Sequence, residues 1–315
     1  MPIPLYKNQQ ESSQEMLIDR YGREIRSLRA SITKRCNLNC IYCHNDGQPL
    51  EGKEELSVGA MTRICRVFNR LGVKKMKISG GEPLIREDCV EMISSLKGFD
   101  EISMTTNGVF LAEKAQDLKE AGLDRINISI DTLKRDRYSK ITRSSPNILS
   151  KVKEGLKEAV EADLTPVKIN MVLLEINRDE IGDFVDYIRK NALQDKVILQ
   201  LIELIDLNGS FPNKVNTNET EGFLMENAKL IGIRRTQNRR RYLYRGVEIE
   251  TVKPVDNTAF CAACSRLRLT ADGFLKPCLL RNDNLVKIRD GSSDKEIERC
   301  IKEAVKRREP YYKRR

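Results

Sequence analysis

Between residues 27 and 205, short apolar runs rich in β-branched residues alternate with longer stretches of helical period. Six runs are expected to be strands, at 27–33, 75–79, 101–106, 125–130, 167–173 and 196–201. Helices are expected between them, near 58–71, 87–97, 111–121, 147–162 and 178–190, and several end at a glycine. Strands that alternate with helices in this way predict a parallel sheet with crossover connections.

Repeated β-α crossovers build either an open doubly wound sheet or an incomplete form of the eightfold barrel, and periodicity does not separate the two. In both arrangements, ligands bind at the carboxyl ends of the strands. Polar or glycine-rich turns follow several of these ends, including the Gly-Gly-Glu-Pro turn at 80–83 and the pair Ser129 and Asp131. We therefore expect the functional residues in these turns.

At 315 residues the chain can form one elaborated α/β domain or two separate domains. The regular alternation stops near residue 206; residues 208–218 are expected to be a loop, and short strands are expected near 241–252. We predict one main domain, residues 1–240, and a smaller C-terminal region, residues 241–315.

The formal net charge of +10 suits binding to nucleic acid, a membrane surface or a small polyanion such as a nucleoside triphosphate. The two most basic stretches, 234–241 and 306–315, are expected to be solvated faces. No apolar run approaches the roughly 20 residues that span a bilayer, and residues 1–15 are too polar for a secretory signal. These features predict a cytoplasmic protein that does not enter a membrane.

Nine cysteines are many for a cytosolic chain, in which clustered cysteines more often bind metal than form disulfides. Cys36, Cys40 and Cys43 follow directly after the first expected strand, and thiolates are ligands of iron-sulfur clusters and zinc. Three thiolates on a four-iron cluster leave one iron open, whereas a structural zinc site needs a fourth ligand. His44 could supply that ligand only with distortion, because it is adjacent to Cys43.

A second group, Cys261, Cys264 and Cys278, again supplies three thiolates, and a second three-ligand cluster is the simplest interpretation. Arg266 and Arg268 lie inside this group, and alternation along a strand directs both guanidiniums to the same side. Paired arginines suit phosphate or carboxylate. The other cysteines fall in helical patterns and are expected to be thiols without chemistry: Cys65, Cys89 and Cys300.

The first cysteine group resembles the motif of the radical S-adenosylmethionine superfamily, which has this spacing and an aromatic residue before the last cysteine, here Tyr42. The Gly-Gly-Glu-Pro turn and the pair Ser129 and Asp131 are also similar to that superfamily. The resemblance implies a 4Fe-4S cluster whose open iron binds the amine and carboxylate of S-adenosylmethionine. One-electron reduction would then yield a 5′-deoxyadenosyl radical.

The second cysteine group with its Arg-x-Arg element, together with segments 19–23 and 28–33, narrows the resemblance to the GTP 3′,8-cyclase family of molybdenum cofactor biosynthesis. This implies an α/β fold, an incomplete (β/α)6 TIM-like barrel, with the first cluster in residues 1–240. Residues 241–315 would hold a second 4Fe-4S cluster and close the barrel. In that family, lyases in the enzyme classification, the radical abstracts the C3′ hydrogen of GTP. Cyclisation gives (8S)-3′,8-cyclo-7,8-dihydroguanosine 5′-triphosphate.

The resemblance also assigns roles to individual residues. It places the two clusters on Cys36, Cys40, Cys43, Cys261, Cys264 and Cys278, S-adenosylmethionine on Tyr42, Gly81, Ser129 and Ile205, and GTP on Arg29, Lys77, Thr105, Lys168, Arg266 and Arg268. It gives Arg266 and Arg268 a catalytic role as well. On the residues alone, Arg29 would be a strand residue paired with a carboxylate, and Lys168 would be a surface lysine.

Several positions depart from the commoner form of the family. Lys77 and Gln200 each stand where an arginine is frequent, and Ile205 replaces a methionine. Lysine keeps the charge of arginine but loses its bidentate fork. The chain ends with a basic segment at 310–315, whereas many relatives end with a Gly-Gly tail that enters the active site. We expect another basic residue near the triphosphate to replace the tail; the alternative is a related reaction on another substrate.

The resemblance further implies an electron donor, a homodimer and product transfer to a downstream cyclic pyranopterin monophosphate synthase. Two other functions stay open. A two-cluster radical enzyme that modifies peptides would usually carry a longer cysteine-rich C-terminal region. A nucleic-acid-binding protein with structural cysteine sites would show a binding motif or interleaved aromatic residues, and the sequence contains neither.

Overall fold

The computed structural model describes residues 16–48, 55–206, 209, 211, 215–255 and 257–309. The six predicted strands are confirmed as β1 (Ser27–Ser31), β2 (Lys75–Ser79), β3 (Glu101–Thr106), β4 (Arg125–Ser129), β5 (Val167–Val172) and β6 (Val197–Ile202), each parallel to the next. The predicted helices are confirmed as α1 (Val58–Arg70), α2 (Cys89–Ser95), α3 (Ala115–Glu120), α5 (Ile148–Glu161) and α6 (Ile181–Lys190). The sequence patterns missed α4 (Arg135–Thr142).

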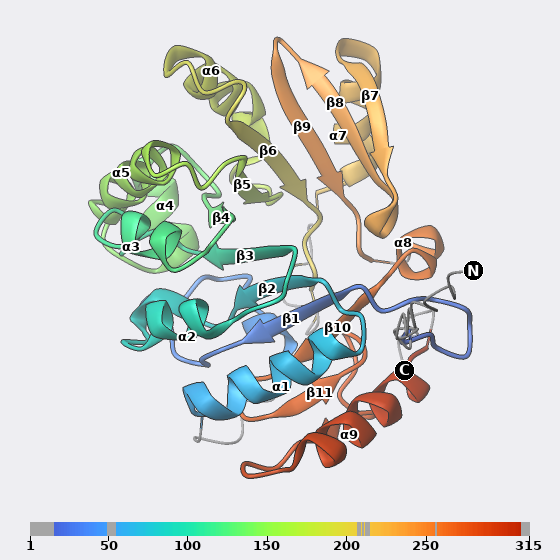
Figure 1. Ribbon diagram of the computed structural model, residues 1–315. Coiled ribbons are helices and arrows are strands. Elements are labelled where there is room, and N and C mark those ends of the chain that lie inside the picture. Colours follow the sequence, from blue (N-terminus) through green and yellow to red (C-terminus); the bar gives the residue numbers. More distant parts are fainter. Residues whose placement is uncertain are drawn as a thin grey trace, which may run out of the picture.

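Strands from the second half of the chain extend both edges of this parallel sheet. On one side are β10 (Arg266–Leu269), β11 (Phe274–Lys276) and β12 (Val286–Lys287); on the other are β9 (Val247–Val252), β8 (Arg239–Tyr244) and β7 (Lys229–Arg234). The order is β12-β11-β10-β1-β2-β3-β4-β5-β6-β9-β8-β7, with β10 parallel to β1 and β9 parallel to β6. Figure 1 shows these late strands on both sides of the parallel core.

The remaining helical elements connect these strands. They are α7 (Thr217–Asn227), α8 (Thr258–Ala262) and α9 (Asp294–Lys306), with short 3₁₀ turns η1 (Asn45–Gly47), η2 (Pro83–Ile85), η3 (Arg178–Glu180) and η4 (Thr236–Asn238). Ser293 and Glu296 form a capping box at the start of α9. This helix packs against α1, where Arg70 binds Asp294 at 2.7 Å.

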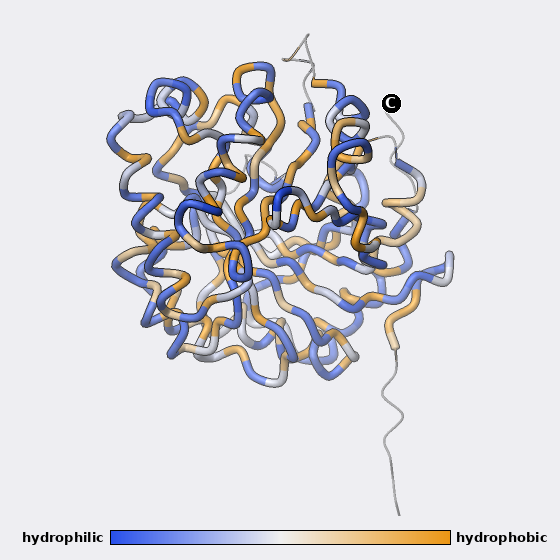
Figure 2. The backbone as a smooth tube through the Cα atoms, turned by 90° about the horizontal axis from the view of Figure 1, so that it is seen from above, coloured by the Kyte–Doolittle hydropathy of each residue, from blue (hydrophilic) through white to orange (hydrophobic). Residues whose placement is uncertain are grey.

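The two faces of the sheet differ in polarity because side chains alternate along each strand. Leu28, Met76 and Ile126 point to the helix-covered face and belong to the main apolar core. Arg29, Lys77 and neighbouring positions on the other strands point to the inner face. In Figure 2, hydrophobic and hydrophilic residues accordingly succeed each other along the chain. The inner face of this sheet is therefore suited to a polar ligand.

Some features expected from the sequence differ in the structure, and others are not tested by it. The two basic stretches are not simply solvated faces, because Arg308 has a side chain only 1% exposed and Arg239 is largely buried. Residue 240, the predicted domain boundary, lies within β8, and the division into two regions stays a prediction. Residues 1–15 and 310–315, and residues 208, 210 and 212–214 of the loop expected at 208–218, lie outside the described residues, while α7 already begins at Thr217. None of the helices in the described ranges is long and apolar enough to cross a membrane.

Gly155 allows α5 to approach the turn after β3 closely. A Cβ atom at this position would lie 2.7 Å from the carbonyl oxygen of Gly108 and 3.0 Å from Cβ of Leu111. By contrast, a Cβ atom at Gly222 in α7 would have no neighbour within 4 Å. Substitution by alanine should therefore have opposite effects on stability at these two helical glycines.

We expect Gly155→Ala to lower the free energy of unfolding by about 1–2 kcal/mol, since overpacking outweighs the gain in helix propensity. Gly222→Ala should raise it by about 0.5–1 kcal/mol. Urea unfolding of the two apoprotein variants measures both changes. Equal stabilisation by both substitutions would contradict the close approach of α5.

Candidate active site

The first cysteine group lies in the loop that follows β1, at the carboxyl edge of the parallel strands. Cys36 and Cys43 are exposed thiols and Cys40 is half-buried. The backbone N–H of Leu38 donates to Cys36 Sγ at 3.5 Å, and that of Asn45 donates to Cys43 Sγ at 3.4 Å. Hydrogen bonds to sulfur stabilise thiolates and tune iron-sulfur clusters. The loop therefore fits a cluster that leaves one side open.

The Gly-Gly-Glu-Pro turn packs directly on this cysteine loop. A Cβ atom at Gly81 would lie 2.1 Å from the carbonyl oxygen of Arg35, so only glycine fits there. The N–H of Gly81 donates to Thr33 O at 2.9 Å. Burial raises the pKa of Glu82 to about 7, and this carboxylate accepts the N–H of Asn107 at 2.6 Å. The turn thus joins the ends of β1, β2 and β3.

Tyr42 lies at the same edge, beside the end of β4. Its hydroxyl donates to Asp131 at 2.6 Å, two residues beyond Ser129. Burial raises the pKa of Asp131 to about 6, although the bond from Tyr42 opposes the rise. Tyr42 also packs against a small apolar cluster of Ile141, Leu174 and Leu204, the last of which precedes Ile205 in the chain. The structure therefore brings the carboxyl ends of β1, β4 and β6 together around Tyr42.

Asp46 occupies the inner face between two strands. Arg268, Arg29 and Lys77 are cross-strand partners on β10, β1 and β2. The Asp46 carboxylate accepts from Arg29 at 2.9 Å, from Arg268 at 2.9 Å and from Ser79 at 2.7 Å. Burial alone would raise the pKa of Asp46, but the two arginines hold it well below its ordinary value. The carboxylate that was expected beside Arg29 on the residues alone is thus present.

Two further cations, Lys77 on β2 and Arg266 on β10, form no ion pair with a carboxylate in the part of the chain that the structure describes. The side chains of Lys77 and Arg266 are largely buried and make no ion pair or hydrogen bond with any residue in the described ranges. Burial, followed by the charges of Arg29 and Arg266, holds the pKa of Lys77 well below its ordinary value. Burial and the charges of Arg268 and Arg29 likewise lower the pKa of Arg266. Buried charge without compensation is unfavourable, so this region is suited to an anionic ligand.

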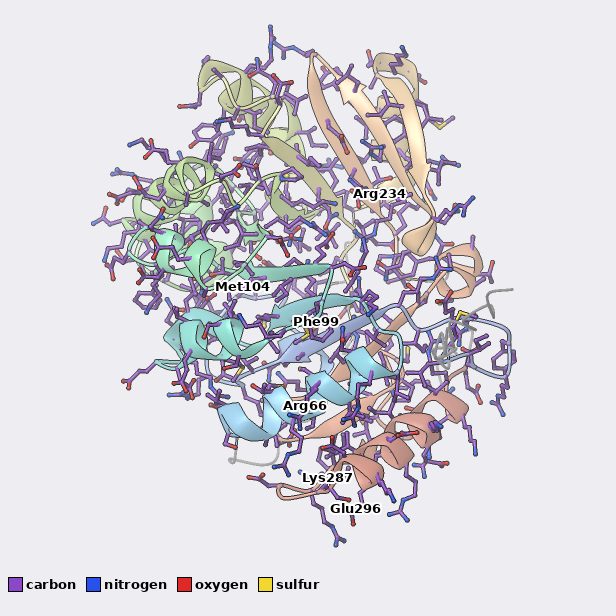
Figure 3. All side chains as sticks on the ribbon, viewed as in Figure 1. Arg66, Phe99, Met104, Arg234, Lys287 and Glu296 are labelled. Atoms are coloured by element: carbon purple, nitrogen blue, oxygen red, sulfur yellow. The ribbon has the colours of Figure 1, made fainter. Side chains whose placement is uncertain are left out.

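A second carboxylate, Glu250 on β9, gathers cations from the opposite side of the inner face. It accepts from Lys168 at 2.5 Å, from Gln200 at 3.0 Å and from Arg239 at 2.9 Å, and Nε of Arg234 lies 2.9 Å away. Figure 3 labels Arg234 near these strands. Lys168 is buried, so the surface-lysine alternative is wrong. Burial lowers its pKa to about 8, against the opposing effect of Glu250.

The second cysteine group lies between the two late edges of the sheet. Cys261 belongs to α8, Cys264 precedes β10 and Cys278 follows β11; all three are half-buried thiols. Although burial opposes ionisation, the charges of Arg308 and Arg266 lower the pKa of Cys264. Cys65 and Cys89 are buried in the core, as expected, and Cys300 packs at its margin.

Polar atoms on the inner face remain to be satisfied. Buried atoms without a partner among the described residues include Thr105 Oγ1, Asn127 Oδ1, Asn170 Oδ1, Arg239 Nε and Arg266 Nε. Such atoms are normally hydrogen-bonded, so they fit a large polar ligand. No three His, Cys, Asp or Glu side chains in the part of the chain that the structure describes are close enough to hold a single metal ion. A four-iron cluster spans a wider set of thiolates than one ion does.

Sequence reasoning missed four residues of this inner face: Asp46, Glu250, Arg234 and Arg239. Asp46 follows the first cysteine group by three positions, which is a usable signal once the loop is placed. Glu250 lies among the apolar residues Val247, Ile249 and Val252 of β9, but Glu248 and Thr251 lie in the same strand, so the sequence does not single it out. The two arginines lie in the stretch interpreted as solvated, and only the pairing of β8 with β9 directs Arg239 inward.

Two family models match the chain. The Radical SAM superfamily model matches residues 30–188, and Molybdenum Cofactor Synthesis C matches residues 197–314. A probable GTP 3′,8-cyclase of Methanosarcina mazei is 47% identical over 309 residues, which cover 96% of this chain and 92% of that protein. A probable GTP 3′,8-cyclase of Archaeoglobus fulgidus is 44% identical over 300 residues, which cover 95% of this chain and 100% of that protein.

Solved structures show the same fold at low sequence identity. Streptococcus suis SuiB bound to S-adenosylmethionine has a TM-score of 0.64 at 17% identity, over 84% of this chain and 63% of that one. The protein anSMEcpe with bound AdoMet has a TM-score of 0.59 at 17% identity, over 88% of this chain and 81% of that one. These similarities confirm the incomplete barrel. Together with the matched models and relatives, they establish that the chain belongs to the GTP 3′,8-cyclase family of the radical S-adenosylmethionine superfamily.

Proposed function

We propose that this chain converts GTP to (8S)-3′,8-cyclo-7,8-dihydroguanosine 5′-triphosphate in molybdenum cofactor biosynthesis. When bound, an iron-sulfur cluster and S-adenosylmethionine supply a 5′-deoxyadenosyl radical that removes the C3′ hydrogen of GTP. The observation that carries the proposal is the pair of largely buried cations, Lys77 and Arg266, whose side chains form no ion pair with any carboxylate among the described residues. They lie between the two cysteine groups, where a triphosphate would compensate their charge.

The first site holds the cofactor. Cys36, Cys40 and Cys43 would bind a 4Fe-4S cluster, and the Gly-Gly-Glu-Pro turn is hydrogen-bonded to the backbone just before this loop. Gly81, Tyr42, Ser129 and Ile205 are proposed to contact S-adenosylmethionine. Gly81 gives backbone access, while the bond to Asp131 fixes the ring of Tyr42. Ile205 can pack only through apolar contact, which suits the adenosine or methionine carbons.

The second site holds the substrate. Arg29, Lys77, Thr105, Lys168, Arg266 and Arg268 are the proposed GTP contacts, and all six lie on strands that face the interior. Asp46 and Glu250 would keep several of these cations oriented before the substrate arrives. The proposed catalytic role of Arg266 and Arg268 is to keep GTP correctly oriented while its C3′ hydrogen is removed.

A second 4Fe-4S cluster on Cys261, Cys264 and Cys278 would complete the substrate site. Three thiolates again leave one position for a ligand. Arg266 and Arg268 lie on β10, two and four residues after Cys264, so these arginines are close to the cysteine group in the chain. A guanine base at the cluster and phosphates at the arginines would then be one continuous ligand. This arrangement favours a nucleotide over a peptide as the substrate.

Arg239 is a further proposed contact to the triphosphate of GTP. Gln200 stands where relatives frequently have arginine, and its amide binds the same Glu250 carboxylate that binds Arg239. The charge of Arg239 also contributes to the lowered pKa of Arg29 and Arg266, after burial and nearer groups. We therefore assign Arg239 to the triphosphate, where its charge stands in for the arginine that Gln200 replaces.

The proposed partners follow from the same chemistry. An electron donor must reduce the cluster, and a downstream cyclic pyranopterin monophosphate synthase would take the product. A homodimer is supported by Leu230, Ile231 and Ile233 on the edge strand β7, which are exposed by 52%, 37% and 53%. Nucleic-acid binding is disfavoured, because Arg239 and Arg241 pair with carboxylates.

Anaerobically reconstituted protein should contain about eight irons in two four-iron clusters. Cys36→Ser should leave about four irons and form no 5′-deoxyadenosine, while Cys264→Ser should leave about four and still cleave the cofactor without making product. Iron analysis and chromatography of 5′-deoxyadenosine measure these outcomes. Zinc with little iron in the unsubstituted protein would exclude a radical enzyme.

Arg268→Met and Arg239→Met should each weaken GTP binding by about tenfold, because each removes a charge-assisted contact. Equilibrium dialysis of the reconstituted enzyme gives the dissociation constants. Arg240→Met is the matched control, since Arg240 lies between two inward positions on β8 and binds Glu221 instead. Equal GTP affinity in all three variants would contradict the triphosphate site.

A further inference from the structure

The segment Asp19-Arg20-Tyr21-Gly22-Arg23 has no part in the chemistry described above, yet it forms an ordered turn. The Asp19 carboxylate accepts the backbone N–H groups of Tyr21 and Arg23, both at 3.0 Å. Gly22 adopts a positive φ of 75° within the turn. The side chain of Asp19 is 0% exposed. A buried aspartate thus closes the turn on itself.

Asp19 also binds two arginines from opposite ends of the chain. Nε of Arg23 donates to Asp19 at 2.8 Å, and Nη1 of Arg308 donates to the same oxygen at 2.8 Å. Arg308 lies just beyond α9, 289 residues away in sequence, and its side chain is 1% exposed. In Figure 1 the end of α9 and the N-terminal segment lie on the same side as α8.

Both guanidiniums then bind the backbone of the second cysteine group. Arg23 donates to the carbonyl oxygen of Cys261 at 3.0 Å, and Arg308 donates to that of Cys264 at 2.7 Å. The N–H of Arg26 adds a bond to Ser265 O at 2.9 Å. The backbone around two of the three thiols is therefore held from both ends of the chain.

The charges of this group do not balance. One carboxylate faces two guanidiniums, so a positive charge remains beside the cysteines. Moreover, Arg23 Nη2 and Arg308 Nε are buried and have no partner among the described residues. Buried donors are normally satisfied, and buried charge is normally compensated. A four-iron cluster on three thiolates is negatively charged and would supply the missing compensation.

We propose that Asp19, Arg23 and Arg308 are positioning residues for the second iron-sulfur cluster. The arginines hold the carbonyl groups of Cys261 and Cys264 and place positive charge next to the cluster, which favours its reduced form. Asp19 orients both arginines. The inference rests on the second cluster of the proposed function, and it explains why the N-terminal turn and the residue after α9 meet at this site.

The test isolates the second cluster in the full-length chain. Replacing Cys36, Cys40 and Cys43 by serine removes the first cluster, and the remaining iron then reports on the second alone. Arg23→Met, Arg308→Met and Arg308→Lys are compared in this background. Arg20→Met is the matched control, because Arg20 belongs to the same turn but its side chain is 54% exposed and binds Glu309.

We expect Arg23→Met and Arg308→Met to release iron to a chelator roughly tenfold faster than the parent, as for other residues that support metal ligands. The midpoint potential of the cluster should fall, because the reduced form loses a nearby positive charge. Arg308→Lys should retain more of the parental potential than Arg308→Met. Arg20→Met should match the parent in both measurements.

Unchanged iron release and potential in Arg23→Met and Arg308→Met would overturn the proposed support. If Arg308→Met does not fold, as judged by circular dichroism, Arg23→Met and Arg308→Lys decide the question. A parent that binds no four-iron cluster would instead overturn the second cluster itself, and with it this inference. The two failures are thus distinguishable from the same set of samples.

Discussion

The carboxylate of Asp46 lies between the guanidiniums of Arg29 and Arg268, and the two halves of the site depend on this interaction. Asp46 belongs to the loop of the first cysteine group, whereas Arg268 belongs to β10, which lies between Cys264 and Cys278 of the second group. The interaction therefore fixes the two cysteine loops relative to each other. The carboxylate also compensates the charge of two arginines on the inner face of the sheet, since buried arginines need a charge partner.

The two ends of the site differ in electrostatic character. Around the first cysteine group, burial raises the pKa of Glu82 and Asp131 to about 7 and about 6, and both carboxyl groups lie at the strand ends. Around the second group, Arg266 and Arg308 lower the pKa of Cys264 against its burial. An acidic end suits the ammonium and sulfonium groups of the cofactor, and a cationic end suits a triphosphate. One sheet can thus hold two ligands of opposite character in a defined order.

The strands, the crossover helices and the placement of turns at their carboxyl ends could be predicted from the sequence, because each depends on local periodicity. Alternation also predicted that Arg266 and Arg268 share a face, which β10 confirms. Arg239 and Arg308 could not be placed in this way. Their burial depends on Glu250 and on Asp19, the latter 289 residues from Arg308. A basic run looks solvated until its distant carboxylates are known.

The central claim is that hydrogen leaves C3′ of GTP within this site. Reconstituted enzyme, reductant, S-adenosylmethionine and GTP carrying deuterium at C3′ provide the direct measurement, read as the mass of 5′-deoxyadenosine. The proposed function predicts that 5′-deoxyadenosine acquires the deuterium. Formation of unlabelled 5′-deoxyadenosine while the deuterium stays in the nucleotide would contradict it.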